Sequence, residues 1–149
     1  MFKKKHGRNH LSNYLDIHRQ ILANYQEGQE APKIYTEKLI TENYLELEVE
    51  DFKILTKKGN WIKVKIHKDV EIDRSGKIPT AKTFTYSYHA RYADSKIGGN
   101  IIRYCSEHGH RPYHHKHIYK QDGSFDVLKI QEDEFPHVNE FLDELIENF

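Results

Sequence analysis

Residues 61–72 read Trp-Ile-Lys-Val-Lys-Ile-His-Lys-Asp-Val-Glu-Ile, and the alternation within this stretch decides the fold class. Apolar and polar side chains follow one another along it. The apolar members are Ile62, Val64, Ile66, Val70 and Ile72, and the polar members are Lys63, Lys65, His67 and Lys68. Such alternation predicts a strand with one buried face and one solvent-exposed face.

The segment before it completes a predicted β-hairpin. Residues 44–55 also alternate apolar with charged side chains. The intervening Lys57-Lys58-Gly59-Asn60 is typical of a turn. The two segments therefore predict an antiparallel pair of strands.

The rest of the chain predicts more strands and two helices. Strands are expected over residues 84–92, 101–104, 113–120 and 125–130, whereas 33–40 is ambiguous. Apolar residues spaced by three and four predict helices over 11–27 and 138–149. We interpret the pattern as an α+β fold, a mostly antiparallel sheet of five or six strands flanked by an N-terminal and a C-terminal amphipathic helix. One domain is expected over 1–149, with 1–10 as a flexible basic tail.

The composition excludes several classes of protein. The 149 residues hold 23 Lys and Arg and 23 Asp and Glu, so the chain as a whole is not a basic nucleic-acid-binding protein. The single cysteine allows no intrachain disulfide, which favours a reducing compartment. No apolar run approaches the roughly 18–20 residues of a membrane span, and none follows the basic start as a secretory signal requires. We therefore expect a cytoplasmic protein without membrane contact.

The zero net charge hides an asymmetry along the chain. Residues 1–10 and 108–120 carry basic residues and no acid, whereas 131–149 carries acids and no Lys or Arg. One interpretation is that these are solvated surfaces. The other is a local cationic site that the acidic segment balances or that a phosphate-rich partner fills.

Histidines concentrate in one segment of the chain. Five of the eleven lie between residues 104 and 119. Histidine has an unperturbed pKa of about 6.5, which lets it accept and donate protons near neutral pH. If residues 113–119 form a strand, His115 and His117 stand on one side of it, about 6–7 Å apart.

Other side chains can join this pair. The preceding predicted strands can add His89 and Arg103. Lys116 faces the opposite side of a regular strand, which makes it a weaker choice. Cys105 could be a nucleophile, but a lone cysteine is more often a small apolar residue.

Three interpretations of the histidine pair remain. In the first, His115 and His117 share the acid and base roles of a metal-free nuclease in which the 2′-OH of RNA is the nucleophile. Arg103 and Lys116 would stabilise the phosphate charge, and His89 would orient a group or assist proton transfer. In the second, His115 and His117 bind zinc with a third histidine that the sequence does not identify. In the third, the histidines are structural or surface residues.

Four motifs, in their order along the chain, resemble those of the TumE-like family, small toxins of bacterial and archaeal toxin–antitoxin pairs. They are Tyr86-Ser87-Tyr88-His89, Ile102-Arg103-Tyr104, His114-His115-Lys116-His117 and Phe135-Pro136-His137-Val138-Asn139-Glu140-Phe141-Leu142. The resemblance covers residues 44–149. The family's motif residues fall on Tyr88, His89, Arg103, Tyr104, His115 and His117.

The resemblance implies a cytoplasmic growth inhibitor that is neutralised by a cognate antitoxin, commonly a small helix-turn-helix protein. One departure matters. After the Arg-Tyr pair the family usually has an acidic residue and then Asn, whereas this chain has Cys105 and Ser106. If that acid orients a histidine or binds a metal in relatives, the activity of this chain is altered or lost.

We therefore expect a toxin that acts as a metal-independent ribonuclease. RNA cleavage is inferred from the toxin class together with the His and Arg chemistry. The expected catalytic residues are His115, His117, His89 and Arg103, and the expected substrate-binding residues are Tyr88, Tyr104, Arg111 and Lys116. No metal and no cofactor are expected, with zinc as the alternative. The alternative functions are a nucleic-acid-binding or regulatory protein without chemistry, and a metal-dependent hydrolase with histidine ligands.

Overall fold

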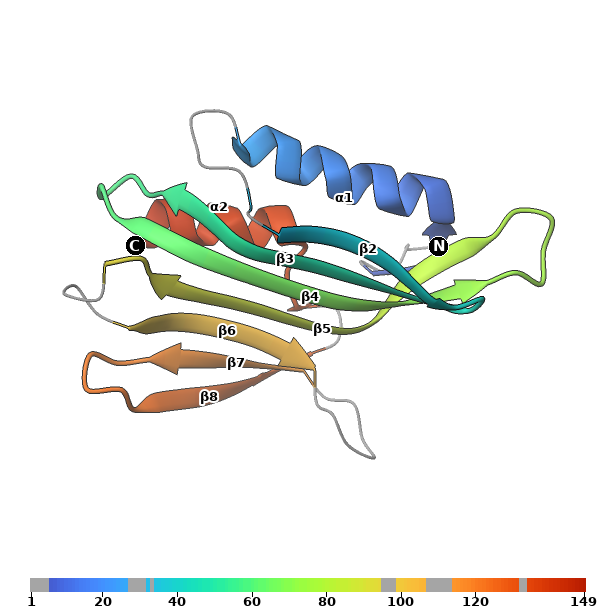
Figure 1. The fold of residues 1–149 in the computed structure, drawn as a ribbon. Helices are drawn as coiled ribbons and strands as arrows, with labels where there is room; N and C mark the ends of the chain where they lie inside the picture. The colour runs from blue at the N-terminus through green and yellow to red at the C-terminus, as the bar shows by residue number, and fades with distance from the viewer. Residues whose placement is uncertain (1–5, 27–31, 33, 95–98, 107–113, 132–133) are drawn as a thin grey trace.

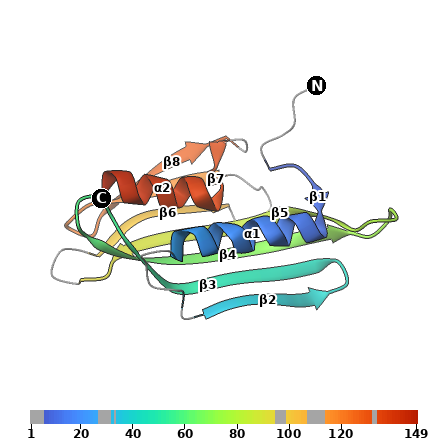
Figure 2. The ribbon, with the colours of Figure 1, turned by 90° about the horizontal axis from the view of Figure 1, so that it is seen from above.

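The computed structural model describes residues 6–26, 32, 34–94, 99–106, 114–131 and 134–149. One antiparallel sheet carries two helices on a single face (Figures 1 and 2). The helices are α1 (Leu11–Gln26) and α2 (Val138–Asn148). The strands are β1 (Asn9–His10), β2 (Ile34–Thr41), β3 (Tyr44–Leu55), β4 (Trp61–Asp73), β5 (Thr80–Tyr92), β6 (Asn100–Ser106), β7 (His114–Tyr119) and β8 (Phe125–Ile130).

Neighbours in the sheet are also neighbours in the sequence. The strand order is β2-β3-β4-β5-β6-β7-β8, and the short β1 pairs with β5. Every pair is antiparallel. This meander follows from the short connections, because a parallel pair needs a long crossover.

The α+β class and the mostly antiparallel sheet are confirmed, but the expected number of five or six strands was too small. The ambiguous segment 33–40 overlaps β2 (Ile34–Thr41), an edge strand whose side chains are mostly exposed, so its sequence carries little apolar alternation. The two residues of β1 are too few for a periodic signal. The helices also do not lie on both sides of the sheet, because both cover the same face (Figure 2).

The core lies between the helices and the face they cover, which we call the inner face. Leu22 of α1 is 3% exposed, and Phe141 and Leu145 of α2 are completely buried. The ring of Phe141 lies 5.4 Å from that of Tyr88 and 5.9 Å from that of Tyr104. The opposite side, which neither helix covers, is called the open face.

Two bulges adjust which side chains reach the inner face. Between Val49 and Phe52, β3 has one residue more than β4, and Asp51 there has a φ of 52°. The extra residue shifts the alternation, so that Val49 and Phe52 are both buried. A second bulge lies at Phe84 of β5, which is 55% exposed.

Strand β4 has no extra residue, so its side chains alternate without interruption. The structure therefore corrects the predicted face of Lys68. The sequence pattern groups Lys68 with the polar side chains of the hairpin. Lys68 nevertheless lies two residues after Ile66 and therefore points to the same side of the strand. Its register partner is the buried Tyr86. Lys68 therefore enters the inner face, where it is 9% exposed.

Part of the segment expected to be a flexible tail, residues 1–10, contacts the sheet. Residues 1–5 lie outside the described residues. Arg8 forms an ion pair with Glu71, and Asn9 and His10 pair with β5. These contacts connect residues 8–10 to β4 and β5, and the flexibility of the tail stays a prediction.

The acidic C-terminal segment pairs with cations of the sheet. Glu144 accepts from the Lys116 ammonium at 3.0 Å, and Glu147 pairs with Lys57. In the part of the chain that is described, no helix has the length and apolar character that crossing a membrane requires.

The packing predicts that truncation of two phenylalanines, one buried and one exposed, will lower the free energy of unfolding by very different amounts. We expect Phe141→Ala to lower the free energy of unfolding by about 3–5 kcal/mol, because it empties a completely buried site. Phe125→Ala removes the same atoms from a side chain that is 50% exposed on β8, so it should change stability by less than about 1 kcal/mol. Urea unfolding followed by circular dichroism measures both, and equal losses would contradict the assignment of the core.

Candidate functional site

The predicted catalytic residues lie on the open face in two cross-strand rows. His89 of β5, Arg103 of β6 and His117 of β7 are direct register partners in one row. Cys105 of β6 and His115 of β7 are direct partners in the next. Because direct partners in an antiparallel sheet point to the same side with Cβ atoms about 4.5–5.5 Å apart, these five residues form one group. We call it the histidine–arginine patch.

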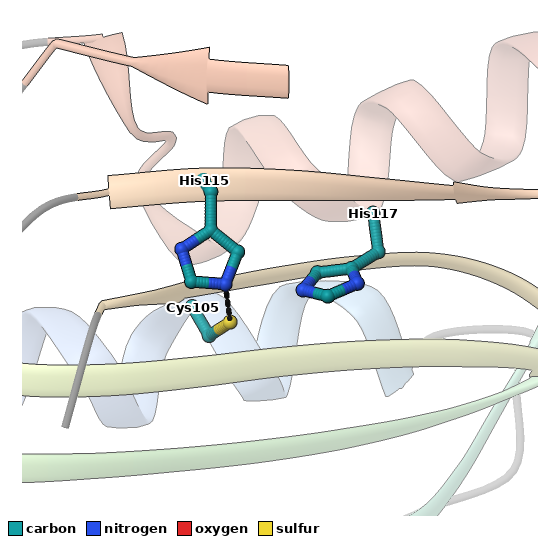
Figure 3. A group of neighbouring side chains, drawn as sticks. All are labelled: Cys105, His115 and His117. Atoms are coloured by element: carbon teal, nitrogen blue, oxygen red, sulfur yellow. Dashed lines mark hydrogen bonds between the residues drawn. The ribbon is translucent and has the colours of Figure 1, made fainter. Parts of the chain in front are cut away.

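Cys105, His115 and His117 converge at one end of this patch (Figure 3). The Cys105 sulfur lies 3.0 Å from His115 Nε2, and the His115 and His117 ring centroids are 4.8 Å apart. The expectation that the two histidines stand side by side is thus confirmed. Cys105 is 5% exposed and His115 is 8% exposed, whereas His117 is more accessible.

Arg103 and His117 each have a polar side-chain atom with no hydrogen-bond partner among the described residues. These atoms are Nε of Arg103 and Nδ1 of His117, and both are buried. Buried polar groups normally have partners, so these two atoms mark a place where a ligand can satisfy them. An anion would also balance the guanidinium charge.

The electrostatics of the patch favour neutral imidazoles. Burial lowers the pKa of His117 below its ordinary value, and the neighbouring His115 and Arg103 lower it further. Burial also lowers the pKa of His89, with Arg103, Arg91 and Lys65 adding to the effect. A neutral imidazole can accept a proton, which a general base must do.

Asn100 fixes the orientation of His89. Nε2 of His89 donates to the Asn100 side-chain carbonyl at 2.8 Å, so its Nδ1 carries the free lone pair. This hydrogen bond raises the pKa of His89, but burial lowers it by more. A cleft of about 390 Å³ opens beside His89 on this face, lined in part by Lys65 and Arg91.

Two aromatic residues, Tyr119 and Phe125, extend the patch, and neither was among the expected site residues. The His117 ring centroid lies 6.2 Å from that of Tyr119 and 5.1 Å from that of Phe125. Tyr119 is also 6.4 Å from His89. The two-residue spacing that places His115 beside His117 also places Tyr119 on that face. The sequence spacing alone therefore predicts the side of the sheet on which Tyr119 lies.

Three of the four expected substrate-binding residues, namely Tyr88, Tyr104 and Lys116, do not join the patch. Tyr88 is completely buried on the inner face, and the Tyr104 hydroxyl donates there to Glu144 at 2.9 Å. Lys116 pairs with the same carboxylate, and its Nζ lies 5.0 Å from the Tyr104 ring centroid. These three side chains therefore support the core and the packing of α2. Arg111 lies outside the described residues.

Cys105 is the most informative residue that the sequence analysis undervalued. It stands where the TumE-like motif usually has an acid, and its sulfur contacts His115. Ser106, which stands in place of the Asn, accepts the backbone N–H of Tyr86 at 3.1 Å. A sulfur thus occupies the position from which a carboxylate could contact His115.

The same three residues could hold a metal ion. One ligand atom from each of Cys105, His115 and His117 can be chosen so that all lie within 4.8 Å of one another. Zinc accepts this set of sulfur and nitrogen ligands, and three protein ligands leave a position for water. The third residue is Cys105 rather than the third histidine of the zinc interpretation.

Comparison with models of protein families, with curated proteins and with solved structures finds no match to this chain. The site is therefore interpreted from its own chemistry. It offers a permanent cation between two imidazoles, a third imidazole in contact with a sulfur, and aromatic rings at the rim.

The origin of the lowered pKa values can be tested by removing one charge at a time. We expect Arg103→Met to raise the pKa of both His89 and His117, because the guanidinium disfavours both imidazolium ions. Arg91→Met should raise the pKa of His89 alone. Histidine titration by NMR measures each pKa. An unchanged pKa of His117 in the Arg103 variant would contradict the geometry of the row.

Proposed function

We propose that this chain is the RNA-cleaving toxin of a toxin–antitoxin pair and that the open face of its sheet binds single-stranded RNA. The row of His89, Arg103 and His117 carries the proposal. Transesterification of RNA needs a base for the 2′-OH, a cation at the phosphate and an acid for the leaving oxygen. The toxin assignment rests on the resemblance to the TumE-like family, whose motif positions include all three residues.

The charge of the open face supports binding of a nucleic-acid backbone. Basic side chains lie in register on this side across the middle of the sheet. They include Lys63, Lys65, Arg91, Arg103 and Lys129. Acids of β3 offset two of them, since Lys65 pairs with Glu50 at 3.2 Å and Lys63 approaches Asp51 at 4.0 Å. The cations nearer β6 are the ones that phosphates can reach.

The aromatic rim supports a single strand rather than a duplex. Phe125 is half exposed, and its ring lies 5.4 Å from that of Tyr119. Unpaired bases stack on exposed aromatic side chains of a sheet, whereas bases inside a duplex cannot reach them. A strand that lays its phosphate on Arg103 can therefore place a base on these rings.

The proposed reaction divides the proton transfers between the two ends of the row. Nδ1 of His89 accepts the 2′-OH proton while O2′ forms a bond to phosphorus. Arg103 balances the added negative charge. The bond from phosphorus to O5′ breaks, and the His117 imidazolium gives its proton to O5′. The products are a 2′,3′-cyclic phosphate and a free 5′-OH.

The roles of the two β7 histidines differ because their surroundings differ. A bound phosphate anion raises the pKa of an adjacent imidazole, so His117 can enter the reaction protonated. His115 was expected to share the proton transfers. Because it is 8% exposed and contacts Cys105, we assign it to positioning of the His117 ring.

The proposed function also requires a partner that restrains it. We expect a cognate antitoxin, commonly a helix-turn-helix protein in the family that the chain resembles. An antitoxin that blocks the row must cover a cationic surface, so its contact region should be acidic.

Variants of the row test the proposal. We expect His89→Ala and His117→Ala to slow cleavage of a single-stranded RNA by about 10²–10⁴-fold each, the usual contribution of one acid or base. Arg103→Met should cause a loss of at least similar size. Cleavage is followed by gel electrophoresis and the cyclic phosphate by mass spectrometry. DNA of the same sequence should stay intact, because it has no 2′-OH.

His10→Ala is the matched control, since His10 is exposed on β1 and lies outside the patch. Circular dichroism confirms that each variant folds. RNA that binds but stays intact would replace the proposal by a nucleic-acid-binding protein without chemistry. Unchanged cleavage in folded His89 and His117 variants would remove the proposed mechanism.

The second candidate is a zinc-dependent hydrolase, favoured by the convergence of Cys105, His115 and His117. A zinc ion there would bind through one sulfur and two nitrogens and would supply an activated water. The adjacent Arg103 would oppose the metal charge and favour a phosphate ester as substrate. This candidate uses the same face but a different set of residues.

Chelation separates the two candidates. For the acid–base mechanism we expect cleavage to continue in EDTA and Cys105→Ser to keep at least one tenth of the activity, because Cys105 touches no reacting atom. For the zinc site, EDTA would abolish cleavage and Zn²⁺ would restore it. Cobalt titration gives an independent measurement, since a cobalt–thiolate absorption band that Cys105→Ser removes would establish the metal site.

A further inference from the structure

A cavity under the helices lies outside the patch, and the proposed function does not use it. It has a volume of about 330 Å³ and lies between α1, the first turn of α2 and the inner face. Its walls include Tyr14 and His18 of α1, Lys68 of β4 and Asn139 of α2. This volume is at the small end of the roughly 300–1,000 Å³ typical of small-molecule sites.

Lys68 brings a positive charge to this cavity. The ammonium lies 5.6 Å from the Tyr14 ring centroid and 5.8 Å from that of Tyr88, within reach of cation–π attraction. Among the described residues, no carboxylate and no hydrogen-bond acceptor is paired with it. Burial lowers the pKa of Lys68 to about 8, so the side chain still carries its charge near neutral pH.

His18 is the second polar side chain that the protein leaves unsatisfied. It is 3% exposed, and neither of its ring nitrogens has a hydrogen-bond partner among the described residues. Burial lowers its pKa to about 3, with Lys68 adding to the effect, so the ring is neutral. A neutral imidazole has one N–H donor, which is therefore available to a ligand in the cavity.

Among the described residues, the carboxylates nearest the cavity have other partners, and Glu140 in the first turn of α2 accepts the backbone N–H of His137 at 2.9 Å. The carboxylate that acts on His18 is that of Glu37, and it already binds Arg19 at 2.7 Å and the Tyr35 hydroxyl. The first residues of α2 line the cavity from the other side, and the N-terminus of a helix carries positive potential. The cavity therefore has a cationic end.

Apolar side chains form another part of the wall, beside the polar residues His6, Asn9, Thr83 and His137. Ile17 and Ile21 of α1 and Val138 of α2 lie along it. A ligand that fits must combine an anionic group with an apolar body, since inorganic phosphate alone would leave these side chains unmatched.

We propose that this cavity binds a small organic acid, with its anionic group held by Lys68 and His18 and its apolar body against α1 and α2. The binding site lies on the inner face and uses none of the residues of the histidine–arginine patch. It is independent of the proposed RNA chemistry. Four of its lining residues come from α1, which precedes the stretch that resembles the TumE-like family.

Matched ligands and variants test the proposal in the full chain. Benzoate is the probe, and benzyl alcohol has the same ring without the charge. We expect benzoate to raise the melting temperature by a few degrees at saturation, as ligand linkage requires, and to bind at least about 10-fold tighter than benzyl alcohol. Octanoate and inorganic phosphate are further probes, and phosphate should bind more weakly than either carboxylate.

Lys68→Met keeps the length of the side chain and removes its charge. Because an unpaired buried ammonium is costly, we expect this variant to melt at the same temperature as the parent or higher. It should bind benzoate at least about 10-fold more weakly. Lys57→Met is the control, since Lys57 pairs with Glu147 at an exposed position and should leave benzoate binding unchanged.

NMR of the unaltered protein gives a test that needs no variant. Benzoate should shift the His18 imidazole signals and leave those of His10 unchanged. No binding of benzoate or octanoate at about 10 mM, equal binding of benzyl alcohol, or an unshifted His18 would each overturn the proposal. Stronger binding of phosphate than of benzoate would overturn the organic acid as the ligand class.

Discussion

The direct cross-strand register from β4 to β7 is the constraint on which both sites depend. Side chains alternate along each strand, so a slip of one residue would exchange the inner and open faces. The register that sets His89, Arg103 and His117 in one row on the open face also sends Lys68 under the helices. Whether a residue on these strands points to the open face or to the inner face thus decides which of the two sites it can join.

Much of this architecture is predictable from local sequence, and the remainder depends on non-local packing. The alternation of residues 61–72 is sufficient for β4, and the apolar spacing locates both helices to within two residues. An edge strand such as β2 has little buried surface, so its sequence carries no comparable pattern. The face on which α2 packs is set by the core around Phe141, and no periodicity within the helix encodes that choice.

The residues of the site also fall into those that the local sequence predicts and those that depend on non-local strand pairing. His115 and His117 are neighbours because of spacing within one strand, which the sequence shows directly. Cys105 and Arg103 reach them through the pairing of β6 with β7, which cannot be derived from either strand alone. Tyr88 and Tyr104 were expected at the site only because of a resemblance in sequence, and a residue of such a motif can instead serve packing. Both contact Phe141 in the core instead of the open face.

The zero net charge conceals an unequal pairing of cations on the two faces. Acids of α2 bind Lys116 and Lys57, whereas Nε of Arg103 and both ring nitrogens of His18, beside Lys68, have no partner among the described residues. An uncompensated buried charge opposes folding, and an apolar side chain at either position would remove that cost. A cation that the fold tolerates without a partner is explained when it meets an anion in the working protein. Under the two proposals, Arg103 would meet a phosphodiester on the open face and Lys68 a carboxylate beneath the helices.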